Sequence, residues 1–416
     1  MSAGETVRTK ETSADASVAS AADVIGEPAA DATATPARTG MGTAMSVALV
    51  TVLTSMPLFL VGATSTLLER DLAGGAGATG LLIAAYWSAS LLGAFTSRRT
   101  DAPVSPETAI ALASLATAVA LTLGACGGGP GLVAGSVIGG FVYGYSQPHT
   151  NFLLIKDCAA RVQGFAFGLK QAAVPTATLL GSVAVPALAV PYGWRAVFGV
   201  MAVGCLLYAV VALCTARTRP TVRRTVKASA PLPWNTQLVA LALAGLCGAT
   251  VGNSLGGFLI ASLAHDGLTL SWASLLAAAG SAVNIAVRLA AGVVVDRRAR
   301  EPRTLLWQLF AVGAVGTLLL GLGGPWAAAV GALLAFGGGW GWAGLLHYVA
   351  GASFPEQAAK ATAFTQMGVS LGGAIGPMTF GFLAGRAGFD VAWLVLTGVG
   401  VLAMVLVAAA GGRPAR

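Results

Sequence analysis

The chain has 416 residues, of which 56% are hydrophobic and only 10% are charged, and its formal net charge is +8. A water-soluble domain of this length needs a more highly charged surface, so the composition excludes an ordinary soluble protein and favours a helical protein that crosses a membrane many times. The five cysteines lie scattered in apolar segments without a Cys-x-x-Cys pair, which argues against a disulfide framework or a cysteine metal site.

The first 42 residues are rich in Ala, Thr, Ser and Asp and contain no aromatic residue. Such a segment cannot bury enough apolar surface to fold, so we expect residues 1–42 to be a disordered tail. The first apolar run comes after this polar tail and is too long for the hydrophobic region of a signal peptide. We therefore expect it to be a membrane span and not a secretion signal.

Twelve apolar segments follow, and each is long enough to cross a hydrocarbon core about 30 Å thick. They cover residues 43–66, 77–96, 107–125, 131–155, 163–189, 195–215, 236–262, 269–295, 304–323, 326–350, 361–385 and 390–411. The predicted fold is therefore an all-α membrane protein with twelve transmembrane helices and both termini on one side. The predicted divisions are a six-helix bundle at 43–215, a basic linker at 216–235, a second six-helix bundle at 236–411 and a short C-terminus at 412–416.

The connections between these segments alternate in charge. On the side of the termini they carry most of the basic residues, among them Arg98, Arg99, Lys156, Arg161, Arg217, Arg219, Arg223, Arg224, Lys227, Arg297, Arg298, Arg300, Arg303 and Lys360. The other side holds few basic residues and several acidic ones. The positive-inside rule then predicts a cytoplasmic (inner) membrane protein with both termini in the cytosol. The positive net charge is explained by this topology, and no nucleic-acid partner is expected.

The two halves of the chain resemble each other. Residues 193–198, at the start of the sixth segment, match residues 388–393, at the start of the twelfth, and the same offset places Gln171 opposite Gln366. Chance similarity among Gly/Ala/Val-rich helices is the alternative. A duplicated six-helix unit is the simpler explanation, and it predicts two pseudo-symmetric bundles with a substrate site near the midplane between them.

A loop motif follows the eighth segment, where residues 292–300 read Gly-Val-Val-Val-Asp-Arg-Arg-Ala-Arg. This run resembles the loop signature of the major facilitator superfamily, although Ala299 replaces the family's glycine and Ser97 replaces the aspartate in the first half. The resemblance implies a monomeric transporter that works by alternating access, with gating roles for Gly292, Asp296, Arg297 and Arg98. Gly292 would permit close approach of helices, and Asp296 would face a helix N-terminus at the gate.

Two cations lie deep within apolar segments. Arg288 is about 12 Å from the segment end at Asp296, and Lys170 lies a similar distance into the fifth segment. Burying an arginine in a membrane costs at least about 2.5 to 3.5 kcal/mol, and no Asp or Glu lies within an apolar segment away from its ends to offset that cost. We therefore predict that both cations face one cavity and bind an anion. Snorkelling of either side chain to the membrane surface is the alternative.

The position of Arg288 also supports an anionic substrate. It stands four residues before the signature glycine and is similar in placement to the carboxylate-binding arginine of oxalate and monocarboxylate carriers of this superfamily. Lys170-Gln171, with Gln147-Pro148 and the run at 339–342, resembles carriers grouped with cyanate permeases.

Uncharged polar side chains of several segments are predicted to line the same cavity. They are Gln171, Asn284, Asn253, Gln366, His347, Tyr348 and Asn151. For each one, a hydrogen bond between helices is the alternative to ligand contact. Proton coupling needs a side chain in the cavity that can titrate, and the candidates are His149 and His347. For each one, a packed or interfacial histidine is the alternative. Anion exchange and facilitated passage are therefore as plausible as proton symport.

The predicted function is a secondary active or facilitative transporter that moves a small anionic solute, with no enzyme activity, cofactor or metal. No ATP-binding Gly-x-x-x-x-Gly-Lys-Ser/Thr loop occurs in the sequence. An exporter of drugs or metabolites with the same fold is the nearest alternative, although the Gly-Pro motif of many such exporters is poorly matched in the fifth segment. A membrane-embedded enzyme would need clustered acids or a nucleophile arrangement, and none is evident.

Overall fold

The structure is a computed structural model that describes residues 40–71, 75–99, 105–216, 235–296, 301–354 and 357–410. Most of the predicted tail, nearly all of the predicted linker and the C-terminal residues lie outside these ranges. The predictions made for those segments therefore fall outside the described residues.

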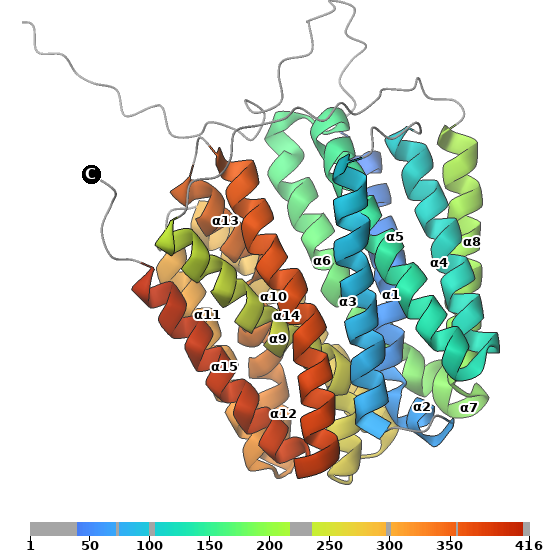
Figure 1. The fold of residues 1–416 in the computed structure, drawn as a ribbon, viewed down its shortest axis with the longest axis vertical. Coiled ribbons are helices and arrows are strands. Elements are labelled where there is room, and N and C mark those ends of the chain that lie inside the picture. Colours follow the sequence, from blue (N-terminus) through green and yellow to red (C-terminus); the bar gives the residue numbers. More distant parts are fainter. Residues whose placement is uncertain are drawn as a thin grey trace, which may run out of the picture.

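The first half of the chain forms one helical bundle and the second half forms another, side by side (Figure 1). The first contains α1 (Met41–Ala63), α2 (Ser65–Asp71), α3 (Gly75–Arg99), α4 (Pro106–Cys126), α5 (Gly128–Asp157), α6 (Ala160–Ala184), the π-helix η1 (Val185–Ala189), α7 (Val190–Tyr192) and α8 (Trp194–Ala216). The second contains α9 (Thr236–His265), α10 (Leu270–Asp296), α11 (Pro302–Leu322), α12 (Pro325–Leu334), the π-helix η2 (Ala335–Gly339), α13 (Ala343–Ser353), α14 (Ala358–Ala387) and α15 (Phe389–Ala409).

The predicted all-α fold with two six-helix bundles is confirmed. Each of the twelve predicted segments coincides with one helix or with one run of helices that continue end to end. Among the described residues, eleven stretches are long and apolar enough to cross a membrane. Helix α5 is not one of them, because its glycines and polar side chains lower its hydropathy, yet it packs against α3 and α4 as a member of the first bundle.

The internal repeat is visible in the backbone. Gly193, before α8, has φ 82° and ψ 160°, and Gly388, before α15, has φ 90° and ψ 162°. These values lie in a region that residues with a side chain rarely adopt, so glycine is required at both positions for the chain to turn from one helix into the next. The same turn therefore occurs at equivalent places in the two halves.

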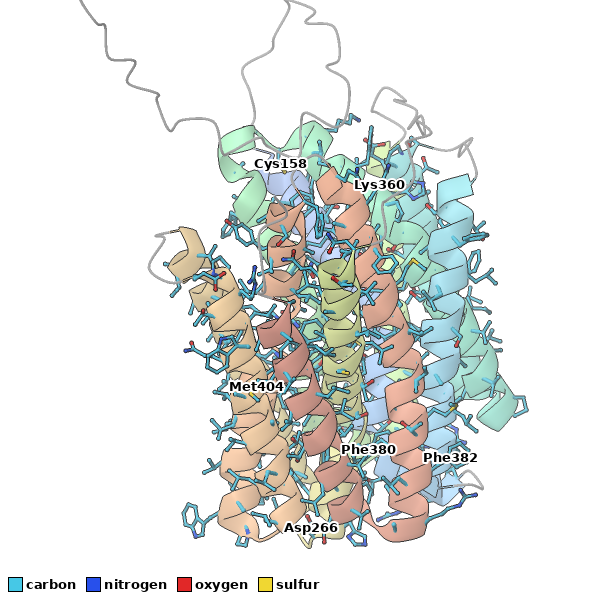
Figure 2. The ribbon with its side chains drawn as sticks, turned by 60° about the vertical axis from the view of Figure 1, so that its left-hand side comes forward. Cys158, Asp266, Lys360, Phe380, Phe382 and Met404 are labelled. Carbon is cyan, nitrogen blue, oxygen red and sulfur yellow. The ribbon has the colours of Figure 1, made fainter. Side chains whose placement is uncertain are left out.

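The molecule has two ends that are useful to name. The terminal end is where α1 begins and α15 ends, and the opposite end carries α2 and α7 (Figure 1). Cys158 and Lys360 lie at the terminal end and Asp266 at the opposite end (Figure 2).

Glycines bring the two bundles together toward the opposite end. A Cβ added at Gly62 of α1 would lie 2.5 Å from the carbonyl oxygen of Gly256 in α9, and one added at Gly80 of α3 would collide with the carbonyl oxygen of Pro377 in α14. A Cβ at Gly381 of α14 would likewise collide with the backbone of α3. These backbone contacts, here called the glycine seam, close the opposite end of the interface.

Candidate functional site

Arg288 reaches from the second bundle to the first. Its Nε donates a hydrogen bond to Asn284 Oδ1 (2.7 Å), and its two terminal nitrogens donate to the carbonyl oxygens of Trp340 (2.9 Å) and Gln171 (3.0 Å). Because Gln171 belongs to α6, the guanidinium lies between the bundles. The snorkelling alternative is therefore wrong for Arg288 in this conformation.

An interruption of helix geometry supplies the acceptors for this cluster. The π-helix η2 and the turn after it depart from regular α-helical hydrogen bonding, and such π segments often occur at functional sites. The carbonyl oxygen of Phe336 accepts from Asn284 Nδ2 (2.7 Å), while that of Trp340 accepts from Arg288. The glycine run at 337–339 lets this segment lie directly against α11, because a Cβ at Gly338 would collide with the backbone of that helix.

Lys170 lies on α6 directly before Gln171 and is only 7% exposed. Its Nζ donates to Asn151 Oδ1 and lies 3.5 Å from the carbonyl oxygen of Gln147, both on α5. Lys170 is therefore not a snorkelling lysine in this conformation either. Since Arg288 binds the carbonyl of the next residue, α6 brings the two predicted cations into one neighbourhood.

Neither cation has a carboxylate partner in the described part of the chain. The ion pairs there are Lys156 with Glu107 and Asp157, Arg195 with Asp71, and His265 with Asp266. All acceptors that contact Lys170 and Arg288 are neutral amide or carbonyl oxygens. These oxygens satisfy hydrogen bonds but do not compensate the positive charge, and a buried charge without a counter-ion is costly.

The other predicted site residues differ in their surroundings. His347 Nδ1 lies 3.1 Å from Thr365 Oγ1 and within electrostatic range of Arg288, so it belongs to the neighbourhood of the cations. Tyr348, Gln366 and Asn151 are exposed, and Gln366 Nε2 donates weakly to a serine hydroxyl at 3.4 Å. These three side chains remain accessible, as a binding role would require.

Asn253 makes the hydrogen bond between helices that is the alternative to ligand contact. Its Oδ1 accepts from Trp87 Nε1 (2.9 Å) across the bundle interface, and its Nδ2 donates to the carbonyl oxygen of Ala249 (2.9 Å). Both polar atoms of the amide make hydrogen bonds within the protein, so in this conformation Asn253 links the bundles. The sequence could not show this, because Trp87 lies 166 residues away in the chain.

The predicted gating residues are only partly described. Gly292 is exposed and an added Cβ would meet nothing within 4 Å, so the prediction that it permits close helix approach is wrong for this conformation. Arg297 and the side chains of Asp296 and Arg98 lie outside the described residues.

Two residues of α5 join the site that the sequence did not single out as ligands. Tyr143 lies within electrostatic range of Arg288. Gln147 has a buried side-chain nitrogen, Nε2, without a hydrogen-bond partner in the described part of the structure. The helical spacing of Tyr143, Gln147 and Asn151 was the available signal, because residues four apart share one face of a helix.

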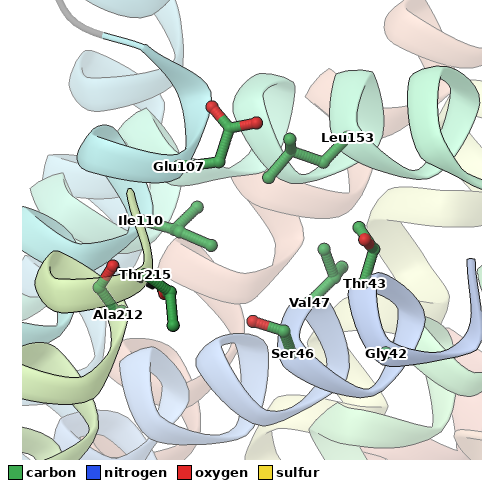
Figure 3. Close-up of a pocket in the computed structure, with 9 residues that line it drawn as sticks. All are labelled: Gly42, Thr43, Ser46, Val47, Glu107, Ile110, Leu153, Ala212 and Thr215. Atoms are coloured by element: carbon green, nitrogen blue, oxygen red, sulfur yellow. Dashed lines mark hydrogen bonds between the residues drawn. The ribbon is translucent and has the colours of Figure 1, made fainter. Parts of the chain in front are cut away.

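A separate small cavity lies at the terminal end of the first bundle (Figure 3). It has a volume of about 60 Å³ and is lined by Gly42, Thr43, Ser46, Val47, Glu107, Ile110, Leu153, Ala212 and Thr215. Neither Lys170 nor Arg288 lines it. This cavity is therefore not the predicted cavity that the two cations would share.

Comparison with known proteins places this geometry in a family. The sequence model of the Major Facilitator Superfamily matches residues 47–346 and 241–416. No curated protein matches the chain in sequence.

Solved structures share the fold at low sequence identity. A D-xylose–proton symporter is 14% identical with a TM-score of 0.73, covering 91% of this chain and 100% of that one. A bacterial homologue of the human lysosomal transporter Spinster, inward-facing and occupied, is 15% identical with a TM-score of 0.68 over 91% and 97% of the two chains. A nucleoside transporter is 13% identical with a TM-score of 0.67 over 89% and 100%.

At these identities the likeness establishes the fold and leaves the substrate open. The family match spans both bundles. The chain is therefore a multi-pass membrane protein and a secondary transporter that belongs to the major facilitator superfamily.

Proposed function

We propose that this transporter carries a small organic or inorganic anion across the cytoplasmic membrane, with Lys170 and Arg288 as the charges that bind it. The observation that carries the proposal is the pair of cations on α6 and α10 that have only neutral oxygens as partners. An anion entering from water would supply the missing negative charge. Arginine binds a carboxylate through two parallel hydrogen bonds, whereas lysine acts as a compact point charge.

Binding would alter the contact between the bundles. The guanidinium has five N–H groups and three are engaged, so an anion can take the two that remain or displace a carbonyl oxygen. The proposed mode is displacement of the Gln171 oxygen, which belongs to the other bundle. A charged acceptor replaces a neutral one there, which makes the exchange favourable. Substrate binding would in this way release one hydrogen bond that joins the halves, as alternating access requires.

The direction of access follows from the glycine seam. Because the seam closes the opposite end, an anion would reach the cations from the terminal end. With both termini in the cytosol, as the distribution of basic residues favours, this conformation would be inward-facing. Among the carriers that the sequence resembles, those of cyanate-permease type fit this proposal.

The proposal is tested by thermal unfolding of the purified protein in detergent with a panel of sodium salts, followed by uptake into proteoliposomes. We expect anions to raise the unfolding midpoint and Arg288→Gln and Lys170→Gln each to abolish both this shift and uptake. Lys156→Gln is the matched control, because it removes a cation that already pairs with carboxylates. Stabilisation by lipophilic cations instead of anions would refute the proposal and favour a drug exporter of the same fold.

A further inference from the structure

Gln147 lies on α5 beside Lys170. Tyr143, one turn before it, is within electrostatic range of Arg288, and Asn151, one turn after it, accepts a hydrogen bond from Lys170. The carbonyl oxygen of Gln147 itself lies 3.5 Å from Lys170 Nζ. Since residues i, i+4 and i+8 follow one face of a helix, Gln147 faces the space that an anion between the cations would occupy.

The side-chain amide of Gln147 has a donor that the described protein does not use. Its Nε2 is buried and has no hydrogen-bond partner there, although most buried polar side-chain atoms are paired. Lys170 and Arg288 are donors themselves and cannot accept from an amide N–H. This nitrogen is therefore left as a donor that an acceptor oxygen of a ligand can use.

We infer that Gln147 is a third, uncharged contact of the anion site and that it makes the site selective for oxyanions over halides. This inference rests on the proposed function. Three donors on three helices, α5, α6 and α10, suit an anion with several acceptor oxygens in different directions, such as a carboxylate or nitrate. A halide offers the donors a single spherical atom, so three donors cannot fix its orientation and it gains less from Gln147.

The test compares acetate, nitrate and chloride as sodium salts of equal ionic strength, read as the unfolding midpoint of the detergent-purified full chain and as titrated affinity. We expect the wild type to bind the two oxyanions more tightly than chloride. Gln147→Met keeps the side-chain length but removes the donor. It should weaken oxyanion binding about tenfold and chloride binding much less, in line with the loss of one hydrogen bond to a charged group.

The ligand-free midpoint gives a second readout. Because the Nε2 donor has no protein partner, Gln147→Met should keep or raise the unfolding midpoint measured without ligand. A lower midpoint would show that the protein itself provides an acceptor for this amide, and it would overturn the inference. Gln237→Met is the matched control, since Gln237 lies on α9 and donates to Ser353 at 3.3 Å. It should leave the oxyanion preference unchanged.

The possible failures are distinguishable. If no anion stabilises the wild type, the proposed function itself fails. If oxyanions stabilise the wild type and Arg288→Gln abolishes this, but Gln147→Met keeps the full preference for oxyanions over chloride, the proposed function stands and the role of Gln147 is refuted.

Discussion

Replacing Asn284 by aspartate would give Arg288 the carboxylate that its surroundings lack. Asn284 is fully buried, and its Oδ1 accepts from Arg288 Nε at 2.7 Å while its Nδ2 donates to the carbonyl oxygen of Phe336 at 2.7 Å. Asn284→Asp keeps the acceptor, adds a negative charge and removes the donor. We expect the variant to fold but to lose anion binding, because the new carboxylate occupies the place of the substrate's charge.

The magnitudes favour this outcome. Two unit charges about 4 Å apart attract each other by about 4 kcal/mol at the effective dielectric constant of protein sites, which corresponds to roughly a thousandfold in affinity. The lost bond to Phe336 costs only about 0.6 kcal/mol, the average for hydrogen bonds between membrane helices. Charge neutralisation therefore outweighs the lost bond, and the unfolding midpoint should be kept or raised.

The assay is the anion-dependent shift of the unfolding midpoint, together with uptake into proteoliposomes. Asn284→Ala separates charge from hydrogen bonding, because it removes both bonds without adding a carboxylate; it should lower the midpoint and weaken anion binding only in part. Asn235→Asp is the control for the substitution, since Asn235 caps α9 by accepting from the amide of Gln237 and aspartate caps helices equally well. Wild-type anion affinity in Asn284→Asp would refute the reasoning that Arg288 needs an external counter-ion.

Two further predictions concern the opposite end. Hydrogen bonds from Trp194 and Arg195 lower the pKa of Asp71, so its carboxylate stabilises the fold above the ordinary aspartate pKa of about 3.9 and this contribution is lost as the pH falls through the lower pKa of the folded state. Asp71→Asn should remove this part of the pH dependence when unfolding midpoints are measured from neutral to acid pH. A variant with the same pH profile as the wild type would contradict the lowered pKa. Gly62→Leu should hold the glycine seam open and lengthen the distance between spin labels on the ends of α1 and α9. Gly199→Leu is the control and should leave this distance unchanged, because an added Cβ there meets nothing within 4 Å. Equal distances in both variants would show that the close backbone contact at Gly62 does not set the separation of α1 and α9.

Much of this architecture could be predicted from the sequence, because long apolar runs determine where the chain spans the membrane. The two cations could be identified because charged residues are rare within such runs. Arg288 contacts the carbonyl of Gln171, the residue after Lys170, and a cavity shared by the two cations stays a prediction. Their partners could not be predicted. The carbonyl of Trp340 is available only because a π-helix interrupts the span, and that depends on packing against α11 and not on local composition.

Two predicted residues have surroundings in this conformation that the sequence does not indicate. Asn253 was assigned to the cavity because it is polar and deep, but a hydrogen bond to Trp87 depends on how the two bundles dock, which no local pattern reports. Gly292 was expected at a helix contact, yet that surface is exposed in this conformation. The loop motif shows where this glycine lies in the chain. It does not show in which conformation of the transport cycle the glycine contacts another helix.

The glycine seam has a consequence for how the carrier responds to its medium. In the described part of the chain no ion pair joins the two bundles, and the opposite end is shut by main-chain atoms in van der Waals contact. Dissolved electrolyte screens charges but leaves steric fit untouched. The rate at which this end parts should thus be nearly independent of ionic strength, so any effect of salt on the transport cycle would come from the anion site and not from this closure.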